Sequence, residues 1–156
     1  LAYLQFFYSP LTGELEFFGV DQRHESDIEG LGRIPSEQQL KSKKVPSFNV
    51  IGNSPLVLRE SLLDEVYKMG ENFVEAAKRV VSPGMNGPFC IEGVYDENAK
   101  FTSFEFSARI VAGTNIYMDG SPYYSLLFNE SMSMGKRIAR EIKIAEEKNQ
   151  IEKIVT

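Results

Sequence analysis

Two carboxylates in the middle of the chain are placed where they could hold a metal ion. Glu92 lies in the apolar run Phe89–Tyr95, and Glu105 lies in the apolar run Phe101–Val111, beyond a short polar turn at Asp96–Lys100. A carboxylate within an apolar strand is unfavourable unless it faces solvent, pairs with a cation or binds a metal. Because the two glutamates are about equally far from the turn, a β-hairpin would make them approximate cross-strand neighbours on one face.

A divalent cation would relieve the repulsion between these two carboxylates. Mg²⁺ (or Mn²⁺) suits such a site, because Mg²⁺ takes few protein carboxylates and completes its coordination with water and substrate phosphates. Ser107 and Arg109 share strand parity with Glu105, so a hydroxyl and a phosphate-clamping guanidinium are expected on the same face. The alternative is that Glu92 and Glu105 face water on an open sheet and Arg109 pairs with one of them. Spacing alone favours this alternative.

The first third of the chain predicts a hairpin and a long polar segment. Two aromatic-rich runs flank a Pro- and Gly-containing turn, which is typical of a β-hairpin. The polar segment predicts a loop with at most one short strand or helical turn, and a short strand follows it. The ranges are Leu1–Tyr8 and Glu14–Val20 for the hairpin, Asp21–Ser47 for the loop and Phe48–Ile51 for the short strand.

The rest of the chain predicts two main helices around the central hairpin. Ser54-Pro55 has the chemistry of a helix start, and apolar residues then recur at helical spacing until Ser82-Pro83-Gly84 ends the pattern. A loop is expected over Gly113–Pro122, a second helix over Met134–Lys148 and a short tail over Ile151–Val155. The predicted fold class is α+β, an antiparallel sheet with flanking helices.

Composition and charge limit the kinds of partner that this chain can bind. The 156 residues are 42% hydrophobic and carry a net charge of −5, which fits one globular domain and argues against nucleic acid as the main partner. No apolar run in the sequence is long enough to span a membrane. The single cysteine, Cys90, cannot form an intrachain disulfide and fits a cytoplasmic location. The chain opens at Leu1 within a strand-like run, so we expect a piece of a longer protein.

The central hairpin resembles the metal-binding hairpin of the ATP-grasp superfamily. In that superfamily one Glu on a first strand is followed by a second strand reading Glu-x-Asn-x-Arg. Glu92 matches the first position, and Glu105-Phe-Ser-Ala-Arg109 matches the second, with Ser107 in place of the usual Asn. The resemblance implies that Glu92 and Glu105 bind Mg²⁺ and that Arg109 is the catalytic residue that stabilises an acyl phosphate.

Several longer stretches are similar to one family within that superfamily. They are Leu4–Leu11, Asp21–Ser26, Glu105–Asn115, Asp119–Tyr124 and Gly135–Ile142. They resemble the carboxyl-terminal half of the archaeal formate-dependent ligases that make 5-formaminoimidazole-4-carboxamide ribonucleotide in purine (IMP) biosynthesis. The resemblance covers nearly the whole of residues 1–156 and implies that ATP, formate and the aminoimidazole carboxamide ribonucleotide react by way of formyl phosphate.

The same resemblance assigns two further residues. Glu25 matches a carboxylate of the ATP site and Asn53 matches a contact to the substrate nucleotide; the alternatives are a solvated loop acid and a helix N-cap. The family's phosphate-gripping lysines and adenine-reading hinge precede this region, so residues 1–156 alone are expected to be inactive. A homo-oligomer is also expected. Two other functions stay open: a non-catalytic binding or assembly module of the same shape, and an ATP-grasp ligase for another carboxylate.

Overall fold

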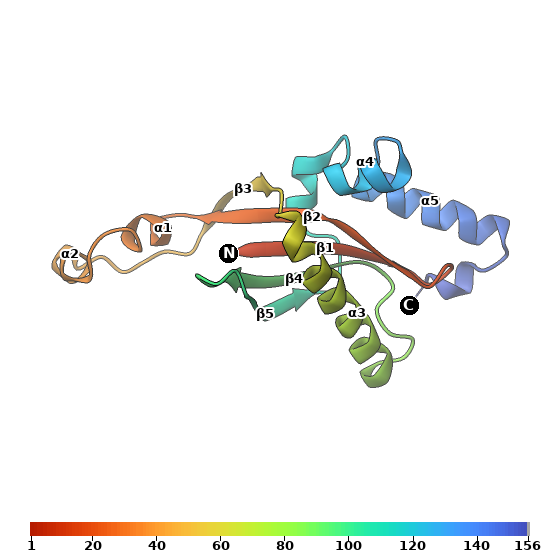
Figure 1. The fold of residues 1–156 in the computed structure, drawn as a ribbon, viewed down its shortest axis with the longest axis horizontal. Coiled ribbons are helices and arrows are strands. Elements are labelled where there is room, and N and C mark those ends of the chain that lie inside the picture. Colours follow the sequence, from red (N-terminus) through yellow and green to blue (C-terminus); the bar gives the residue numbers. More distant parts are fainter. Residues whose placement is uncertain (156) are drawn as a thin grey trace.

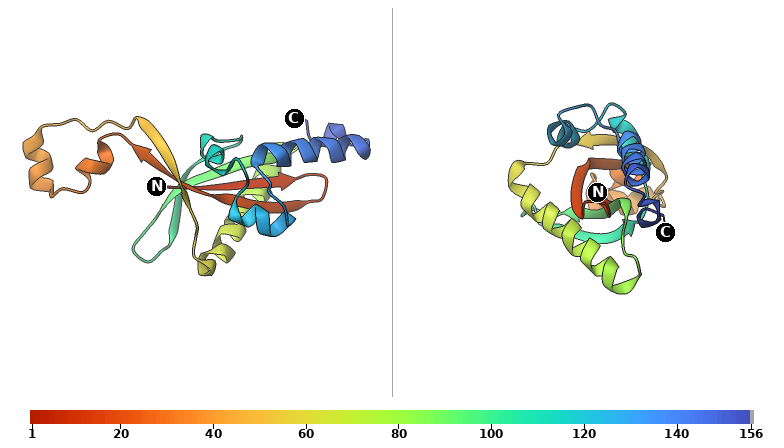
Figure 2. Two further views of the ribbon diagram at one scale, coloured as in Figure 1. Left: turned by 90° about the horizontal axis from the view of Figure 1, so that it is seen from above. Right: turned by 90° about the vertical axis from the view of Figure 1, so that its right-hand side faces the viewer.

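The centre of the molecule is a five-stranded antiparallel sheet with the strand order β3-β2-β1-β4-β5. The computed structural model describes residues 1–155. Its strands are β1 (Ala2–Ser9), β2 (Glu14–Glu25), β3 (Val50–Leu56), β4 (Gly87–Tyr95) and β5 (Phe101–Ser107). Helix α3 covers one face of this sheet, and helices α4 and α5 lie on the other (Figure 1, Figure 2). The predicted antiparallel α+β fold is confirmed.

Strand β1 is the central strand, and all eight of its residues are buried. Successive side chains of a strand point to opposite faces. Leu4, Phe6 and Tyr8 therefore join the core beneath α3, whereas Tyr3, Gln5 and Phe7 face the other side. Burial of each large apolar side chain contributes about 1.5–3 kcal/mol, so β1 is a main source of stability.

Helix α3 (Leu63–Val80) begins later than the sequence predicts. The expected start at Ser54-Pro55 is wrong, because these residues continue β3 and a single 3₁₀ turn, η1 (Glu60–Leu62), precedes the helix. Pro55 is tolerated because β3 is an edge strand, where a residue without an N–H need not interrupt the ladder. The predicted end of the helix, before Ser82, is confirmed.

The other face is covered by α4 (Pro122–Phe128) and α5 (Met134–Glu147). Helix α5 agrees with the helix predicted over Met134–Lys148. Helix α4 lies in a segment for which the sequence predicts no helix or strand. Both helices begin at serine caps: Ser121 accepts from the backbone N–H of Tyr124, and Ser133 accepts from that of Lys136. Such caps satisfy amide groups that the first turn of a helix leaves free.

The segment between β2 and β3 forms an arm that projects beyond the end of the sheet (Figure 1). It carries two short helices, α1 (Ile28–Leu31) and α2 (Ser36–Ser42), neither of which has a buried residue. The prediction of a loop from Asp21 is wrong in its first part, because β2 runs on to Glu25. The segment also holds two short helices where at most one short element was expected.

Three further boundaries differ from the predictions. The short strand expected over Phe48–Ile51 runs over Val50–Leu56. Strand β5 ends at Ser107 rather than Val111, and the 3₁₀ helix η2 (Ala112–Tyr117) occupies much of the expected loop over 113–122. A last 3₁₀ turn, η3 (Ile151–Lys153), lies in the predicted tail. Arg109 thus follows the end of β5 and its orientation is not set by strand alternation.

Candidate metal and phosphate site

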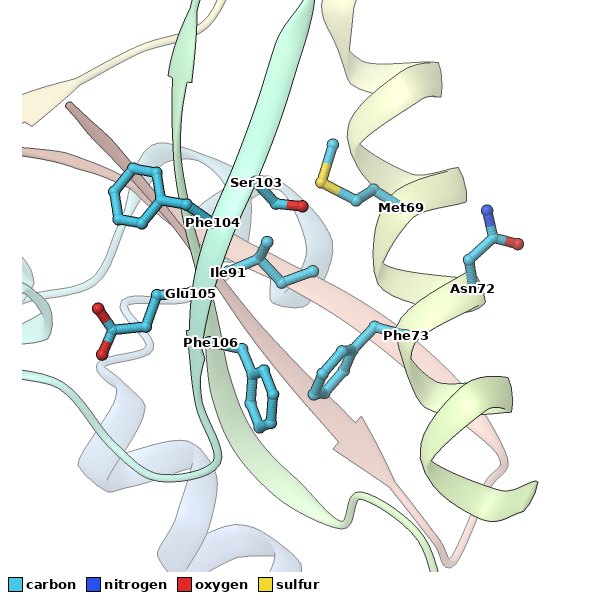
Figure 3. A pocket seen from close by; sticks show the side chains of 8 residues that line it. All are labelled: Met69, Asn72, Phe73, Ile91, Ser103, Phe104, Glu105 and Phe106. Atoms are coloured by element: carbon cyan, nitrogen blue, oxygen red, sulfur yellow. The ribbon is translucent and has the colours of Figure 1, made fainter. Parts of the chain in front are cut away.

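Glu92 and Glu105 are direct cross-strand partners in the β4–β5 hairpin. The register shifts between Glu92 and Gly93, which leaves Phe104 without a partner as the extra residue of a β-bulge. Figure 3 shows Glu105 pointing away from α3, whereas Phe106 points toward the helix. The pair therefore lies on the face opposite α3. The predicted cross-strand pairing is confirmed, and the role of the two glutamates as metal ligands stays a prediction.

Glu92 is a buried carboxylate with few partners. It is only 3% exposed. One of its oxygens, Oε1, accepts a hydrogen bond from Ser107 Oγ at 3.1 Å, and the other, Oε2, accepts from Arg23 Nη2 at 3.5 Å. Charge-assisted hydrogen bonds are usually about 2.7–2.9 Å long, so the contact to Arg23 is weak. Its cross-strand partner Glu105 is exposed, so the pair joins one buried carboxylate to one that solvent reaches.

Tyr3 lies between the acidic and basic groups of this face. The Arg23 guanidinium stacks on its ring at 4.1 Å from the centroid. Burial raises the pKa of the Tyr3 phenol; Arg23 opposes this rise, while the carboxylates of Glu92, Glu25 and Asp21 add to it. Charged groups of strands β2 and β4 therefore act together on this one phenol.

Asp21 is the second buried carboxylate of the face. It is 1% exposed, and burial raises its pKa, although hydrogen bonds from Gln5 and Asn53 favour its charged form. Asn53 Nδ2 donates to Asp21 Oδ2 at 2.6 Å, and Gln5 Nε2 donates to the other oxygen. Gln5 Oε1 is buried without a hydrogen-bond partner among the described residues.

Asn53 is held by this network at the edge strand β3, directly opposite Arg23 of β2. Its position inside a strand shows that the alternative role as a helix N-cap is wrong. Because Asn53 donates its amide N–H to Asp21, its side-chain oxygen is left to accept from another group. That arrangement is suited to an N–H or O–H donor of a ligand.

Glu25 lies at the far end of β2, where the arm begins. It is half-buried, and strand parity places it on the same face as Asp21 and Arg23. It also lines a hollow of about 470 Å³ between the sheet and the arm. The other lining residues are Leu1, Gln22, Ile28, Glu29, Gly32, Arg33 and Phe48.

Arg109 is exposed and its Nη1 donates to the backbone oxygen of Ile110 at 3.0 Å. Its charge lowers the pKa of the Cys90 thiol, whereas burial, the dominant cause, raises it. Cys90 pairs with Ser107 across the hairpin, so Arg109 lies within electrostatic reach of the site face. Cys90 itself is buried, and the raised pKa keeps its thiol protonated and unreactive.

The site contains residues that the sequence did not single out: Tyr3, Gln5, Asp21 and Arg23. A signal was present in β1, where Tyr3 and Gln5 alternate with large apolar residues, which is typical of a strand with one polar face. Their contacts with β2 and β4 depend on the strand order, and spacing along the chain does not determine that order.

The available side chains suit Mg²⁺ or Mn²⁺ rather than a metal ion that takes all its ligands from protein side chains. Within residues 1–155 no group of three or more His, Cys, Asp or Glu side chains could hold a metal. Magnesium usually takes one or two carboxylates, and water and phosphate complete its coordination.

Within residues 1–155, no helix has both the length and the apolar character needed to cross a bilayer.

The fold and the carboxylate hairpin define the class: this is the carboxyl-terminal part of an ATP-grasp fold. The structure superimposes with a TM-score of 0.80 on the IMP biosynthesis protein PurP from Thermococcus kodakaraensis, which is 35% identical in sequence. The match covers 99% of this chain and 48% of that one.

The sequence is also similar to curated archaeal proteins named 5-formaminoimidazole-4-carboxamide-1-(beta)-D-ribofuranosyl 5'-monophosphate synthetase. The relative from Nitrosopumilus maritimus is 85% identical over 100% of this chain, and the relative from Pyrococcus horikoshii is 51% identical over 99%. In both cases the match covers 46% of the relative, so the chain spans about half the length of the curated relatives it matches.

A family described as "Domain of unknown function (DUF1297)" matches residues 1–156, and the chain belongs to this family. The resemblance inferred from the sequence is confirmed: the relatives carry the name of the expected ligase, and the matched region is their carboxyl-terminal part.

Proposed function

We propose that residues 1–156 form the metal- and substrate-binding carboxyl-terminal domain of an ATP- and formate-dependent ligase of IMP biosynthesis. The ligase converts 5-aminoimidazole-4-carboxamide ribonucleotide into the formamido product, with ADP and phosphate. The observation that carries the proposal is that Glu92 and Glu105 are cross-strand partners on the face that also positions Asn53 through Asp21. The names of the relatives support the identity of the reaction.

In the proposed reaction, a formate oxygen attacks the γ-phosphorus of ATP while the bond to the ADP oxygen breaks. The amine of the ribonucleotide then attacks the carbon of formyl phosphate, loses a proton and displaces phosphate. Such reactions depend on alignment of the reactants and neutralisation of phosphate charge. Bound Mg²⁺ or Mn²⁺ supplies part of that neutralisation.

The side chains of this domain have separate tasks. Glu92 and Glu105 hold the cation beside the phosphates, and Arg109, exposed past the end of β5, reaches the acyl phosphate. Asn53 presents its side-chain oxygen to the ribonucleotide, and Glu25 contacts ATP beside the hollow at the arm. Catalysis also needs the groups that grip the triphosphate, so we propose that residues 1–156 alone do not turn over.

We propose that the ligase works in the cytoplasm as a homo-oligomer. A non-catalytic module of the same shape would keep the core beneath α3 but would not need Glu92 buried beside Arg23, because a buried carboxylate is costly without a role or a partner. A ligase for another carboxylate would keep the metal site and differ in its acceptor.

The test is a titration of the full-length parent with Mg²⁺ in the ligase assay and with Mn²⁺ in a direct binding assay. Glu92→Gln and Glu105→Gln should each raise the half-saturating concentration of both cations by about tenfold or more. Glu97→Gln, an exposed carboxylate in the turn of the same hairpin, is the matched control and should behave as the wild type. Unchanged cation dependence in both site variants would overturn the metal assignment.

The two rival functions give different results in the same experiment. A ligase for another carboxylate would show the same metal dependence but no turnover with formate. A non-catalytic module would show no ATP consumption with any carboxylate, in the wild type as well as in the variants.

A further inference from the structure

Arg23 occupies the position between the proposed metal ligands and the proposed substrate contact. It lies directly across from Asn53 in the β2–β3 ladder, and its guanidinium contacts Glu92 Oε2 at 3.5 Å. Strand alternation and these contacts place it on the face that carries Glu105, above the ring of Tyr3. It is therefore the cation that links the two halves of the site.

The geometry of Arg23 leaves it able to bind a further anion. Its side chain is 30% exposed, so part of the guanidinium edge is open, while the flat face rests on Tyr3 at 4.1 Å. Stacking fixes the plane of the group without using its N–H donors, and a guanidinium in a fixed plane can grip phosphate with two parallel hydrogen bonds.

The contact to Glu92 is easily exchanged. At 3.5 Å it is long for a charge-assisted hydrogen bond, and Arg23 is the one cationic partner of Glu92 in the part of the chain that the structure describes. A divalent cation on Glu92 would take over the neutralisation of that carboxylate. It would also repel the guanidinium, which then needs another anion.

A phosphate approaching this face needs more than the metal. It meets the carboxylates of Asp21, Glu25, Glu92 and Glu105. The first three raise the pKa of the Tyr3 phenol, which Arg23 lowers, and Glu105 is the cross-strand partner of Glu92. Their repulsion of a phosphate is offset only where a cation faces it. Arg23 lies among these acids, in contact with Glu92 and the Tyr3 ring, and can supply that cation.

We infer that Arg23 is a phosphate-binding residue that pairs with Glu92 when no divalent cation is bound and turns to a phosphate oxygen of the substrate when the cation binds. The inference rests on the proposed function, since it requires a metal at Glu92. The phosphate comes from the nucleoside triphosphate or from the ribonucleotide monophosphate, which share this chemistry.

The test compares Arg23→Gln and Arg23→Lys with the wild type in the full-length parent. Mn²⁺ alone, Mg²⁺·ATP and the ribonucleotide are titrated separately by calorimetry. Arg23→Gln should bind Mn²⁺ alone a few-fold more tightly, because a competing cation is removed. It should bind the phosphate ligand about 10- to 100-fold more weakly, the range expected for lost hydrogen bonds to a charged group.

Arg23→Lys keeps the charge but loses the planar fork and the stacking on Tyr3. It should leave the affinity for Mn²⁺ alone near that of the wild type and still weaken binding of the phosphate ligand. Arg79→Gln removes an exposed arginine of α3, on the opposite side of the sheet, and should change neither affinity. A loss confined to ATP or to the ribonucleotide identifies which phosphate Arg23 binds.

Three results would overturn the inference. Arg23→Gln could leave both phosphate ligands bound as in the wild type while Glu92→Gln loses Mn²⁺, which would remove this inference alone. Arg23→Gln could weaken Mn²⁺ and phosphate binding together with a lower melting temperature, which would show a purely structural role. Equal Mn²⁺ binding by the wild type and Glu92→Gln would remove the proposed function and this inference with it.

Discussion

Gly113 of η2 lies directly over the carboxylate of Asp21, so closely that a Cβ atom on the glycine would overlap the carboxyl carbon and both oxygens. Both residues are buried. The contact explains why the carboxylate is shielded from solvent although it lies on the polar face of the sheet. It also joins η2 to the hydrogen-bonded chain Gln5–Asp21–Asn53.

Gly113→Ala should therefore damage both stability and ligand binding. The added methyl must displace either η2 or Asp21, and overpacking of this kind typically costs about 1–3 kcal/mol. If Asp21 moves, Asn53 loses the partner that orients its amide, and affinity for the ribonucleotide should fall. Thermal unfolding and ribonucleotide titration of the full-length parent provide the measurements. Gly135→Ala is the control, because its Cβ would meet no atom within 4 Å.

Asp21→Asn should change how stability depends on pH. Burial raises the pKa of Asp21 above its ordinary value of 3.8, so the native state binds this proton more tightly than the unfolded state. The contribution of the protonated group to stability is complete below about pH 4 and is lost as pH rises through the native pKa. Asparagine does not titrate, and its amide can donate to the unpaired Gln5 Oε1.

The melting temperature of Asp21→Asn relative to the wild type should therefore improve as pH rises from about 4 toward neutrality. The exposed carboxyl of Asp119 provides the control variant, Asp119→Asn. Parallel pH profiles for Asp21→Asn and the wild type would contradict the role assigned to burial.

Arg137→Met should be strongly destabilising. Arg137 is 4% exposed and binds Glu16 through Nε and Nη2 and Glu141 through Nη1, at distances of 2.7–3.0 Å. Burial alone would lower the pKa of Arg137, but its hydrogen bonds to the two glutamates outweigh that effect and raise it. Removal of the guanidinium leaves two buried carboxylates without their cation, which typically costs about 3–5 kcal/mol.

The corresponding fall in melting temperature is roughly 10 °C for a domain of this size. Lys143→Met is the matched control on the same helix, because the Lys143 side chain is 76% exposed and its contact to Glu147 is 3.9 Å long. It should change the melting temperature little. A similar small change in both variants would show that the buried ion cluster does not hold α5 to the sheet.

Ser107→Ala should weaken cation binding without unfolding the domain. Its hydroxyl donates to Glu92 Oε1 at 3.1 Å and so orients one of the proposed ligands. Loss of such a supporting hydrogen bond typically lowers metal affinity about 10- to 100-fold. Mn²⁺ titration gives the measurement, and Ser103→Ala, an exposed position on the same strand, is the control. Wild-type Mn²⁺ affinity in Ser107→Ala would show that Glu92 needs no help from this hydroxyl.

The sequence predicts the hairpin with Glu92 and Glu105 well because the information is local. A five-residue polar turn, Asp96–Lys100, separates two apolar runs, and that spacing brings the glutamates within one position of each other in a regular hairpin. The bulge at Phe104 keeps the glutamates opposite each other, and the spacing did not reveal it. Arg109 was placed less well because β5 ends before it.

Other features depend on contacts between distant segments and were missed for that reason. Ser54-Pro55 has the local chemistry of a helix start, but pairing with β2 keeps these residues extended. The contact of Arg23 with Glu92 spans 69 residues and crosses the intervening strand β1. Propensity and spacing along the chain do not predict such a contact. The resemblance to known ligases singles out Asn53 and Glu25 but does not explain what holds them in place.

The two-sided packing of strand β1 limits insertions and deletions in this family more than substitutions. The same eight residues supply the hydrophobic core with Phe6 and the polar network with Gln5. Deletion of a single β1 residue before Gln5 would invert every side chain after it, so that Gln5 would enter the core and Phe6 would replace it beside Asp21. Substitution can adjust either face independently, but insertion or deletion within this strand would remove folding and ligand recognition in one step.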